Sequence, residues 1–230
     1  MKKTISKKIA IAIDGPAASG KSTTAKLVAE QLGYLHIDTG AMYRAITWKV
    51  LQKQISLDDE KNIIALAQHS TVRLLATQEG NKVLLDDEDI TNAIRMPMVS
   101  HAVSAVSSYD AVRTVMVREQ QQMAAEGGVV LDGRDIGTVV LPDADLKIFM
   151  IANVEERARR RKRDLAKQGV EANETDLIHE LETRDKKDST RAASPLKKAQ
   201  DAVELDTSHL SIDEQVEFIV ARAQQIIDSK

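Results

Sequence analysis

The stretch that decides the fold of this chain is Gly15-Pro16-Ala17-Ala18-Ser19-Gly20-Lys21-Ser22. It fits the pattern GxxxxGK[ST] at every fixed position. The apolar run at residues 9–13 precedes it and is typical of a strand buried on both faces of a parallel sheet. Apolar residues at helical spacing follow over residues 22–32. A glycine-rich turn between a buried strand and a helix indicates a loop whose backbone wraps around phosphate groups.

The residue types in this loop indicate how a nucleotide would be held. The glycines let backbone N–H groups approach the β-phosphate, and the helix N-terminus adds partial positive charge. Lys21 is expected to reach the β- and γ-phosphates, and the Ser22 hydroxyl to ligate Mg²⁺. Asp132 directly follows the apolar residues 129–131 and is expected to support that Mg²⁺ or its waters. The alternative for Asp132 is a turn or cap residue.

The rest of the chain alternates short apolar runs with helical patterns. In addition to residues 9–13 and 129–131, strands are expected at residues 34–37, 146–151 and 202–205. Helices are expected at residues 41–51 and, after a capping box that begins with Ser211, up to about residue 227. Strands that alternate with helices predict a parallel sheet flanked by helices, so the fold class is α/β.

Residues 55–127 interrupt this alternation. Within them, residues 71–77 and 82–85 flank Gln78-Glu79-Gly80-Asn81 and are typical of a β-hairpin. Residues 99–125 then have the pattern of a long helix with an irregularity near residues 107–110. We interpret the region as a small α+β insertion in the main domain.

Composition excludes several classes of function. A chain with 43% hydrophobic and 29% charged residues is globular, and a net charge of −3 argues against a protein that coats nucleic acid. The absence of cysteine excludes disulfides and thiolate chemistry, and none of the five histidines has the spacing of a zinc site. Residues 1–8 are basic and do not resemble a signal peptide, and no run of about eighteen apolar residues occurs. We therefore expect a cytoplasmic protein with no membrane partner.

Two arginine-bearing segments favour a phosphoryl transferase whose acceptor is itself phosphorylated. They are Asp38-Thr39-Gly40-Ala41-Met42-Tyr43-Arg44 and Asp132-Gly133-Arg134-Asp135-Ile136-Gly137, and each follows an expected strand. Ligands of open parallel sheets bind at the carboxyl edge, and an arginine fork can hold two phosphate oxygens. A guanine-reading GTPase is disfavoured because the closest match to its NKxD motif, Asn81-Lys82-Val83-Leu84, lacks the Asp. A motor ATPase needs a larger domain than 230 residues provide.

A run of basic residues begins at Arg157. Seven of the fourteen residues from Glu155 to Gln168 are Arg or Lys. In a kinase, such a segment forms a lid whose arginines close over the transferring phosphoryl group and exclude water, so Arg157 is a candidate catalytic residue. The alternatives are a solvated helical face with pairs such as Glu155–Arg159 and Glu156–Arg160, and a nucleic-acid patch. The absence of interleaved aromatic residues disfavours the nucleic-acid patch.

Four strings give the chain a resemblance to a known family. They are GPAASGKS, DTGAMYR, DGRDIGTVVLPDA and the charged segment from Arg184 to Arg191, whose helix is expected to stop at Ser194-Pro195. Together they resemble the bacterial cytidylate kinases over essentially the whole chain. The resemblance implies a P-loop nucleoside-monophosphate-kinase-like fold, with a five-stranded parallel sheet flanked by helices, a small insert that binds the monophosphate, and an arginine-rich lid.

The resemblance also implies a reaction and the residues that carry it. The ATP γ-phosphoryl group would pass to CMP or dCMP, with Mg²⁺ as the cofactor, to give ADP and CDP or dCDP. The implied ATP-binding residues are Gly15, Pro16, Ala17, Ala18, Ser19, Gly20, Lys21, Ser22 and Thr23. The implied acceptor-binding residues are Thr39, Arg44 and Arg134 for the CMP phosphate, Ser104, Arg113 and Asp135 for cytosine, Arg184 and Asp188 for the ribose, and Arg191 for the phosphates. The candidate catalytic residues are then Lys21, Arg134, Arg157 and Arg191.

The two cytosine-reading residues Ser104 and Arg113 lead to a structural prediction. They are nine residues apart, which is about 2.5 turns of helix. One continuous helix would place them on opposite faces. We therefore predict that the helix breaks between them, near residues 107–110.

We expect one P-loop kinase domain over residues 1–230. Its core is expected at residues 1–54, 126–152 and 190–230, with the insert at residues 55–125 and the lid at residues 153–189. Another small acceptor, UMP or shikimate, is an alternative substrate. A nucleotide-dependent RNA-binding protein that uses the arginine run at residues 157–163 is the alternative from a different class. A monomer that binds ATP and CMP and no nucleic acid is expected.

Overall fold

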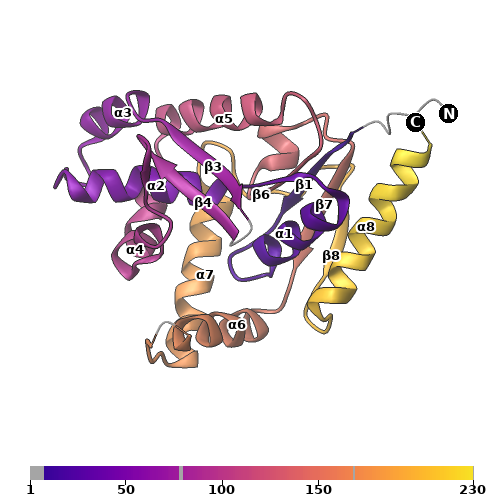
Figure 1. The fold of residues 1–230 in the computed structure, drawn as a ribbon. Helices are drawn as coiled ribbons and strands as arrows, with labels where there is room; N and C mark the ends of the chain where they lie inside the picture. Colours follow the sequence, from indigo (N-terminus) through magenta and orange to yellow (C-terminus); the bar gives the residue numbers. More distant parts are fainter. Residues whose placement is uncertain (1–7, 78–79, 168, 230) are drawn as a thin grey trace. The chain divides into compact units, whose positions relative to one another are not determined.

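The computed structural model describes residues 8–77, 80–167 and 169–229. The chain divides into two compact units. The residues up to His36 form the first unit together with Glu126 and the residues after it, and Ile37–Ala125 form the second. Figure 1 traces the elements of both units along the chain. Among the described residues, no helix has the length and apolar character needed to cross a membrane.

The first unit is built on a five-stranded sheet with the strand order β2-β6-β1-β7-β8. The strands are β1 (Ala10–Asp14), β2 (Leu35–Asp38), β6 (Val129–Gly133), β7 (Leu146–Ile151) and β8 (Val203–Asp206). β1 pairs in parallel with β6 and with β7, and β7 pairs in parallel with β8. The predicted five-stranded parallel sheet is confirmed. Because Asp14 pairs with Gly133, the segments that follow β1 and β6 leave the sheet side by side at its carboxyl edge.

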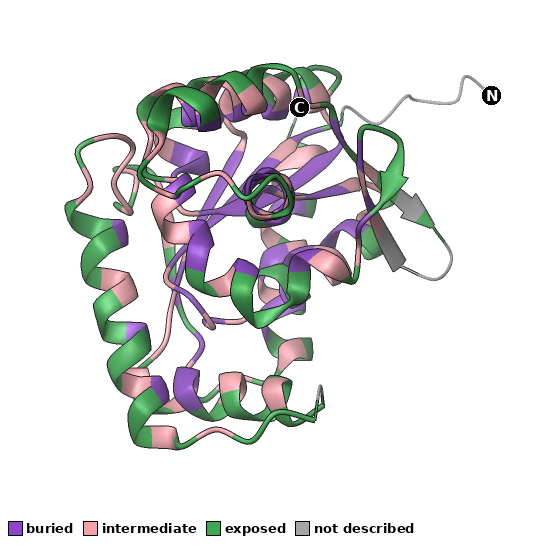
Figure 2. Ribbon diagram, turned by 90° about the vertical axis from the view of Figure 1, so that its left-hand side faces the viewer, coloured by how far each residue is buried: buried purple, intermediate pink, exposed green. Residues whose placement is uncertain are grey.

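Apolar side chains at alternate positions of β1 pack against helices and so bury one face of the sheet. Ile11 and Ile13 are fully buried and belong to one core cluster with Val28 and Ile219. These last two residues come from α1 (Lys21–Leu32) and α8 (Ile212–Asp228), which cover that face of the sheet. Figure 2 shows the strands as largely buried and the outer surfaces of the helices as exposed. Ser211 begins α8 with the predicted capping box.

Two further helices follow β7 in the first unit. They are α6 (Val154–Ala166) and α7 (Glu174–Thr190), drawn in orange tones in Figure 1, and they pack against each other. Ala158, Leu177 and Leu181 form a small apolar cluster with Ala17 of the glycine-rich loop. The base of the predicted lid is therefore packed directly on that loop.

The end of α7 differs from the sequence prediction. The helix ends at Thr190, so the expected stop at Ser194-Pro195 is wrong. Arg191 adopts an extended conformation, and its Nε donates a hydrogen bond to the Ser194 carbonyl at 2.6 Å. The backbone N–H of Leu196 then donates to the Asp188 carbonyl at 2.8 Å. The chain therefore turns back on the last helical turn through residues 191–196, a segment that includes the proline.

In its described residues, the second unit combines five helical segments with a small sheet. Its elements are α2 (Thr39–Gln52), α3 (Glu60–Gln68), β3 (Val72–Thr77), β4 (Gly80–Leu85), β5 (Glu88–Asp89), the short η1 (Ala93–Arg95), α4 (Pro97–Val106) and α5 (Asp110–Ala124). β3 and β4 form the predicted antiparallel hairpin, and β5 adds a third strand. Gln78 and Glu79 of the expected turn lie outside the described residues. The unit begins at Ile37 and includes α2, whereas the sequence suggested an insert at residues 55–125.

The predicted break in the long helix is confirmed. α4 ends at Val106 and α5 begins at Asp110. Between them, the Ser108 hydroxyl donates to the Ala105 carbonyl at 2.6 Å, and the Tyr109 hydroxyl donates to the Leu57 carbonyl at 2.6 Å. These side-chain bonds compete with the helical pattern and redirect the chain.

Candidate active site

The glycine-rich loop joins β1 to α1 and depends on glycine at two positions. Gly15 has φ +149°, and a Cβ built on it would lie 2.1 Å from the carbonyl oxygen of Met150 in the neighbouring strand. Gly20 has φ +97° and is the N-cap of α1, so it gives the chain its entry into the helix. Backbone this close to a strand is possible only without a side chain. The glycines of the motif are thus explained by packing as well as by phosphate binding.

Lys21 lies folded over this loop. The side chain is 4% exposed, and Nζ donates to the Pro16 carbonyl at 2.5 Å and to the Ser19 hydroxyl at 3.2 Å. Burial lowers the pKa of Lys21 well below its ordinary value, and the positive charge of Arg134 adds to this effect. Negative charge placed in the loop would therefore stabilise the ammonium form. This is the environment that a phosphate-binding lysine needs.

A buried carboxylate lies behind the hydroxyl of Ser22. The Ser22 hydroxyl donates to Asp132 Oδ2 at 2.6 Å, while His36 Nε2 lies 2.7 Å from Asp132 Oδ1. Burial acts to raise the pKa of Asp132, but the bonds from His36 and then Ser22 outweigh it and lower the pKa below the ordinary value. Asp132 is therefore ionised. It lies near the end of β6, where the sequence predicted a carboxylate, and it bonds directly to the serine of the loop. His36 was not anticipated, because a histidine inside a short apolar strand has no local pattern that marks it.

Asp14 is a second buried carboxylate at the same edge of the sheet, and it too was not expected from the sequence. Its two oxygens accept the backbone N–H groups of Ile136 at 2.8 Å and Gly137 at 2.7 Å. Those residues begin η2 (Ile136–Val140), a single π-helical turn after β6. Burial raises the pKa of Asp14 from 3.8 to about 6. The signal that could have found it is its position at the end of β1, which matches that of Asp132 at the end of β6.

The arginine-bearing segment after β6 meets α7 in a cluster of alternating charges. Arg134 Nε donates to Asp188 Oδ2 at 2.9 Å, and Arg191 Nη2 lies 3.7 Å from Asp135 Oδ1. Burial acts to raise the pKa of Asp188, but Arg134 and then Arg184 outweigh it and lower the pKa. The structure thus brings together all five candidate acceptor residues of the first unit. Both Arg134 and Arg184 also lie near enough to Lys21 to affect its pKa.

The other four candidate acceptor residues belong to the second unit. Thr39 is buried at the first position of α2, and Arg44 Nη1, one turn further along, donates to Ser100 at 2.9 Å. Ser104 is half-buried on α4, and Arg113 is buried on α5.

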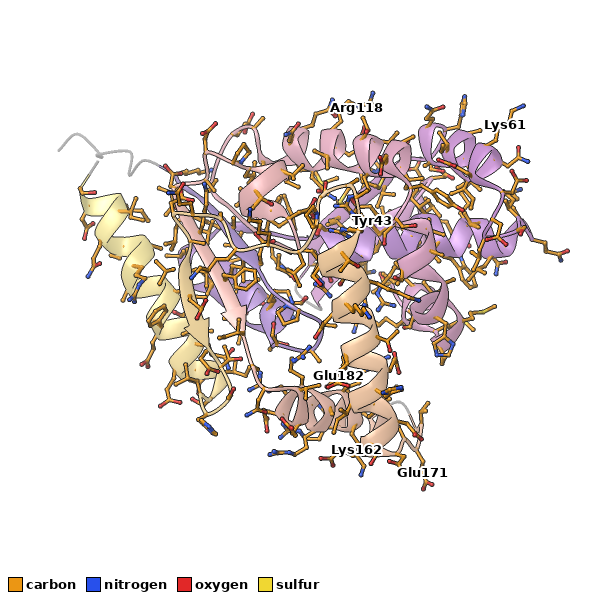
Figure 3. All side chains as sticks on the ribbon, turned by 180° about the vertical axis from the view of Figure 1, so that it is seen from behind. Tyr43, Lys61, Arg118, Lys162, Glu171 and Glu182 are labelled. Carbon is orange, nitrogen blue, oxygen red and sulfur yellow. The ribbon has the colours of Figure 1, made fainter. Side chains whose placement is uncertain are left out.

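Arg113 is held by two contacts within the second unit. Its guanidinium lies 5.1 Å from the centre of the Tyr43 ring, and Nη1 donates to the Ser107 carbonyl at 3.2 Å. Figure 3 labels Tyr43 on α2. The helix break at residues 107–109 therefore supplies a partner for Arg113.

The arginine run on α6 is divided between the interior and the surface. Arg157 is 6% exposed and donates to the Ala17 carbonyl at 3.2 Å and to Asp185 Oδ2 at 2.6 Å. Arg160 donates to the Ser19 carbonyl at 3.0 Å. To reach a phosphoryl group, Arg157 would first have to leave these partners.

The outward side of α6 carries the remaining basic residues. The exposed Arg159 and Arg163 pair with Glu156. The inward Arg160 pairs with the same carboxylate, so the expected Glu156–Arg160 pair is present. Arg159 bonds to Glu156 at 2.9 Å and lies 3.9 Å from Glu174, in place of the expected Glu155. Lys162, labelled in Figure 3, is exposed on this helix. The solvated-face interpretation therefore holds for part of the run only.

Known proteins resemble the chain over nearly its full length. The sequence model of the family described as cytidylate kinase matches residues 11–225. A cytidylate kinase of Bacillus pumilus (strain SAFR-032) is 54% identical over 220 residues, which are 96% of this chain and 98% of that protein. A cytidylate kinase of Bacillus subtilis (strain 168) is 51% identical over 219 residues, which are 95% of this chain and 98% of that protein.

Among solved structures, an uncharacterized protein from Eubacterium ventriosum ATCC 27560 aligns with a TM-score of 0.50 and 17% identity, covering 97% of this chain and 100% of that one. This likeness concerns the fold alone. The sequence matches, in contrast, run through both compact units with about half of the residues identical. The chain belongs to the cytidylate kinase family.

Proposed function

We propose that this chain transfers the γ-phosphoryl group of ATP to CMP, and also to dCMP, to give ADP and the corresponding diphosphate. The observation that carries the proposal is the charge cluster beside the phosphate loop, in which Arg134 and Arg191 face Asp188 and Asp135. Arginines near a phosphate-binding lysine suit an acceptor that is itself a phosphate. The names of relatives more than 50% identical to this chain support CMP as that acceptor.

On the donor side, the loop backbone and Lys21 would hold the β- and γ-phosphates of ATP. The Ser22 hydroxyl would bind Mg²⁺, with Asp132 behind it. These residues fit the ion, because oxygen ligands are what Mg²⁺ prefers and the Ser22 proton is already directed at Asp132. When bound, Mg²⁺ neutralises charge on the phosphate oxygens. The described residues contain no group of three or more His, Asp or Glu side chains that could hold a metal alone, and Mg²⁺ in such enzymes takes several ligands from phosphate and water.

On the acceptor side, an oxygen of the CMP phosphate is the nucleophile. It is anionic at neutral pH, so the reaction needs no general base. The bond from this oxygen to the γ-phosphorus forms as the bond from phosphorus to the β,γ-bridging oxygen breaks, and ADP leaves. Arg134 and Arg191 would hold the acceptor and neutralise the developing charge, with Thr39 and Arg44 as further phosphate ligands. Arg157 would join them after leaving Asp185.

Base recognition would come from Ser104, Arg113 and Asp135. Cytosine presents an amine donor at N4 and acceptors at N3 and O2, whereas uracil presents an acceptor at O4 and a donor at N3. A carboxylate supplies the acceptor that N4 needs, and an arginine supplies donors for N3 and O2. Arg184 and Asp188 would contact the ribose.

An acceptor panel tests the proposal. Purified protein is incubated with Mg-ATP and CMP, dCMP, UMP or shikimate, and ADP release is followed with time. CMP and dCMP should give acceptor-dependent ADP, with kcat/KM higher for both than for UMP or shikimate. A higher kcat/KM for UMP or shikimate would assign a different acceptor. Sedimentation of the same sample tests the expected monomer.

The RNA-binding alternative is not favoured. Arg157 and Arg160, the inward members of the arginine run, already donate to carbonyl groups of the phosphate loop. RNA binding would show as an affinity that falls steeply with salt, without ADP release that depends on an acceptor.

A further inference from the structure

Three side chains of the first unit form a chain of hydrogen bonds from the interior to the surface. Ser22 is exposed on the first turn of α1, whereas Asp132 and His36 are 3% and 7% exposed. Asp132 receives the Ser22 hydroxyl at 2.6 Å on one oxygen and lies 2.7 Å from His36 Nε2 on the other. The three residues come from α1, β6 and β2. A buried histidine is therefore connected to an exposed hydroxyl through a single carboxylate.

The proton positions in this chain follow from the chemistry of its members. An ionised carboxylate only accepts hydrogen bonds, so Asp132 requires a proton on both partners. The ring of His36 therefore carries hydrogen on Nε2. The Ser22 hydroxyl has one proton, which it donates in the hydrogen bond to Asp132. Both lone pairs of the Ser22 oxygen are then left for a ligand on its exposed side, and a hydroxyl in this state can bind a cation.

We propose that His36 is a positioning residue for the divalent cation of the bound nucleotide, acting through Asp132 on Ser22. The inference rests on the proposed function only in that a Mg²⁺-nucleotide occupies the phosphate loop. By occupying Oδ1, His36 fixes the rotation of the carboxylate and leaves Oδ2 for Ser22. Without this bond, the Asp132 carboxylate can rotate, and the Ser22 proton is no longer held away from the ligand.

The expected size of the effect follows from similar arrangements around other metal ions. Removal of a side chain that orients a metal ligand typically lowers metal affinity by a factor of about ten or more. Packing alone would predict a different outcome, because an apolar side chain in β2 would fill the same space and leave metal binding unchanged. Measuring how strongly nucleotide binding depends on the metal therefore distinguishes a positioning role of His36 from a packing role.

Calorimetric titration of ADP, with Mg²⁺ and with a chelator in place of Mg²⁺, measures this dependence without any acceptor. The ratio of the two Kd values is compared in wild type, His36→Leu, His36→Gln and His36→Asn. The amide nitrogen of Gln lies where histidine has Nε2, and that of Asn lies where histidine has Nδ1. Thr24→Val is the matched control, because Thr24 is buried on the same helix and donates to Gln215 at 2.7 Å.

The Mg²⁺ enhancement of ADP binding should fall about tenfold in His36→Leu and His36→Asn and return in His36→Gln. It should be unchanged in Thr24→Val, whatever that substitution does to stability. An unchanged enhancement in His36→Leu would overturn the inference, and so would a Gln variant that behaves like the Asn variant. If the Leu variant does not fold, the Gln and Asn pair makes the same comparison. Failure of the proposed function would appear in the acceptor panel with wild-type protein, and ADP binding does not depend on it.

Discussion

Replacement of Asp14 by Asn gives a quantitative test of how the edge of the sheet is held together. The side chain is 4% exposed and accepts the backbone N–H groups of Ile136 and Gly137. Burial raises its pKa from 3.8 to about 6, although the two N–H groups act in the opposite direction. In the unfolded chain the carboxyl group returns to its ordinary pKa. The native state therefore holds this proton more tightly than the unfolded state does.

The sign and size of the pH effect follow from this difference. Below the unfolded pKa both states are protonated, and Asp14 contributes no pH dependence. Between 3.8 and about 6 the unfolded state releases the proton and the native state keeps it, so the free energy of unfolding falls as pH rises. Each pKa unit corresponds to about 1.4 kcal/mol, which gives a loss of about 3 kcal/mol by neutral pH. Asn cannot titrate, so Asp14→Asn removes this loss.

Urea unfolding without nucleotide, at constant ionic strength between about pH 4 and about pH 7, measures the effect. The stability of Asp14→Asn relative to wild type should rise by about 2.4 kcal/mol over that range, because part of the loss has already occurred at about pH 4. Any constant cost of the lost hydrogen bond cancels in this comparison. Asp206→Asn is the control, because Ser208 holds the pKa of Asp206 below its ordinary value and the slope should have the opposite sign. A relative stability of Asp14→Asn that is flat or falls with pH would refute the reasoning.

Five further substitutions, in three experiments, test the loop and the base site. Lys21→Met should lower kcat by two orders of magnitude or more without loss of thermal stability, because it removes a desolvated ammonium group; near-normal turnover would exclude Lys21 from the mechanism. Gly15→Ala should cost roughly 3 kcal/mol or more in urea unfolding, whereas Gly33→Ala, with nothing within 4 Å of its Cβ, should cost about 1 kcal/mol; equal costs would contradict the close approach at Gly15. Ser104→Ala and Asp135→Ala should each lower the CMP-to-UMP ratio of kcat/KM by roughly five- to 150-fold, mainly through CMP, and an unchanged ratio in both would place base recognition elsewhere.

The features that could be predicted from the sequence are those that depend on residues close together in the chain. The strand, glycine loop and helix around Lys21 follow from a motif with a fixed spacing, and the structure has all three. The break between Ser104 and Arg113 follows from a geometric conflict, since nine residues of unbroken helix cannot present both side chains on one face. In each case the physical constraint acts within a few residues of the chain.

The features that were missed depend on contacts between distant parts of the chain. Asp14 and Ile136 are 122 residues apart, and His36 and Asp132 are 96 apart. No periodicity or turn signal connects such pairs, because the parallel pairing of the strands brings them together. The end of α7 was misplaced for a related reason. Pro195 is a strong local signal, but the helix already ends at Thr190. There the Arg191 side chain bonds to the Ser194 carbonyl, and the backbone N–H of Leu196, beyond the proline, returns to the Asp188 carbonyl.

The distribution of buried charge in the first unit argues that this edge of the sheet is built for an anionic ligand. Lys21, Asp14, Asp132 and Asp188 are each less than 9% exposed. Burying an ionised group costs several kcal/mol, and well-packed apolar residues of similar volume are generally no less stabilising than buried ion pairs. A fold selected for stability alone would have no reason to gather such groups at the carboxyl ends of β1 and β6. Phosphate groups would bring further negative charge to Lys21 and the neighbouring arginines. The carboxylates of Asp188 and Asp14 hold Arg134 and the backbone amides of Ile136 and Gly137 in position before the ligand arrives.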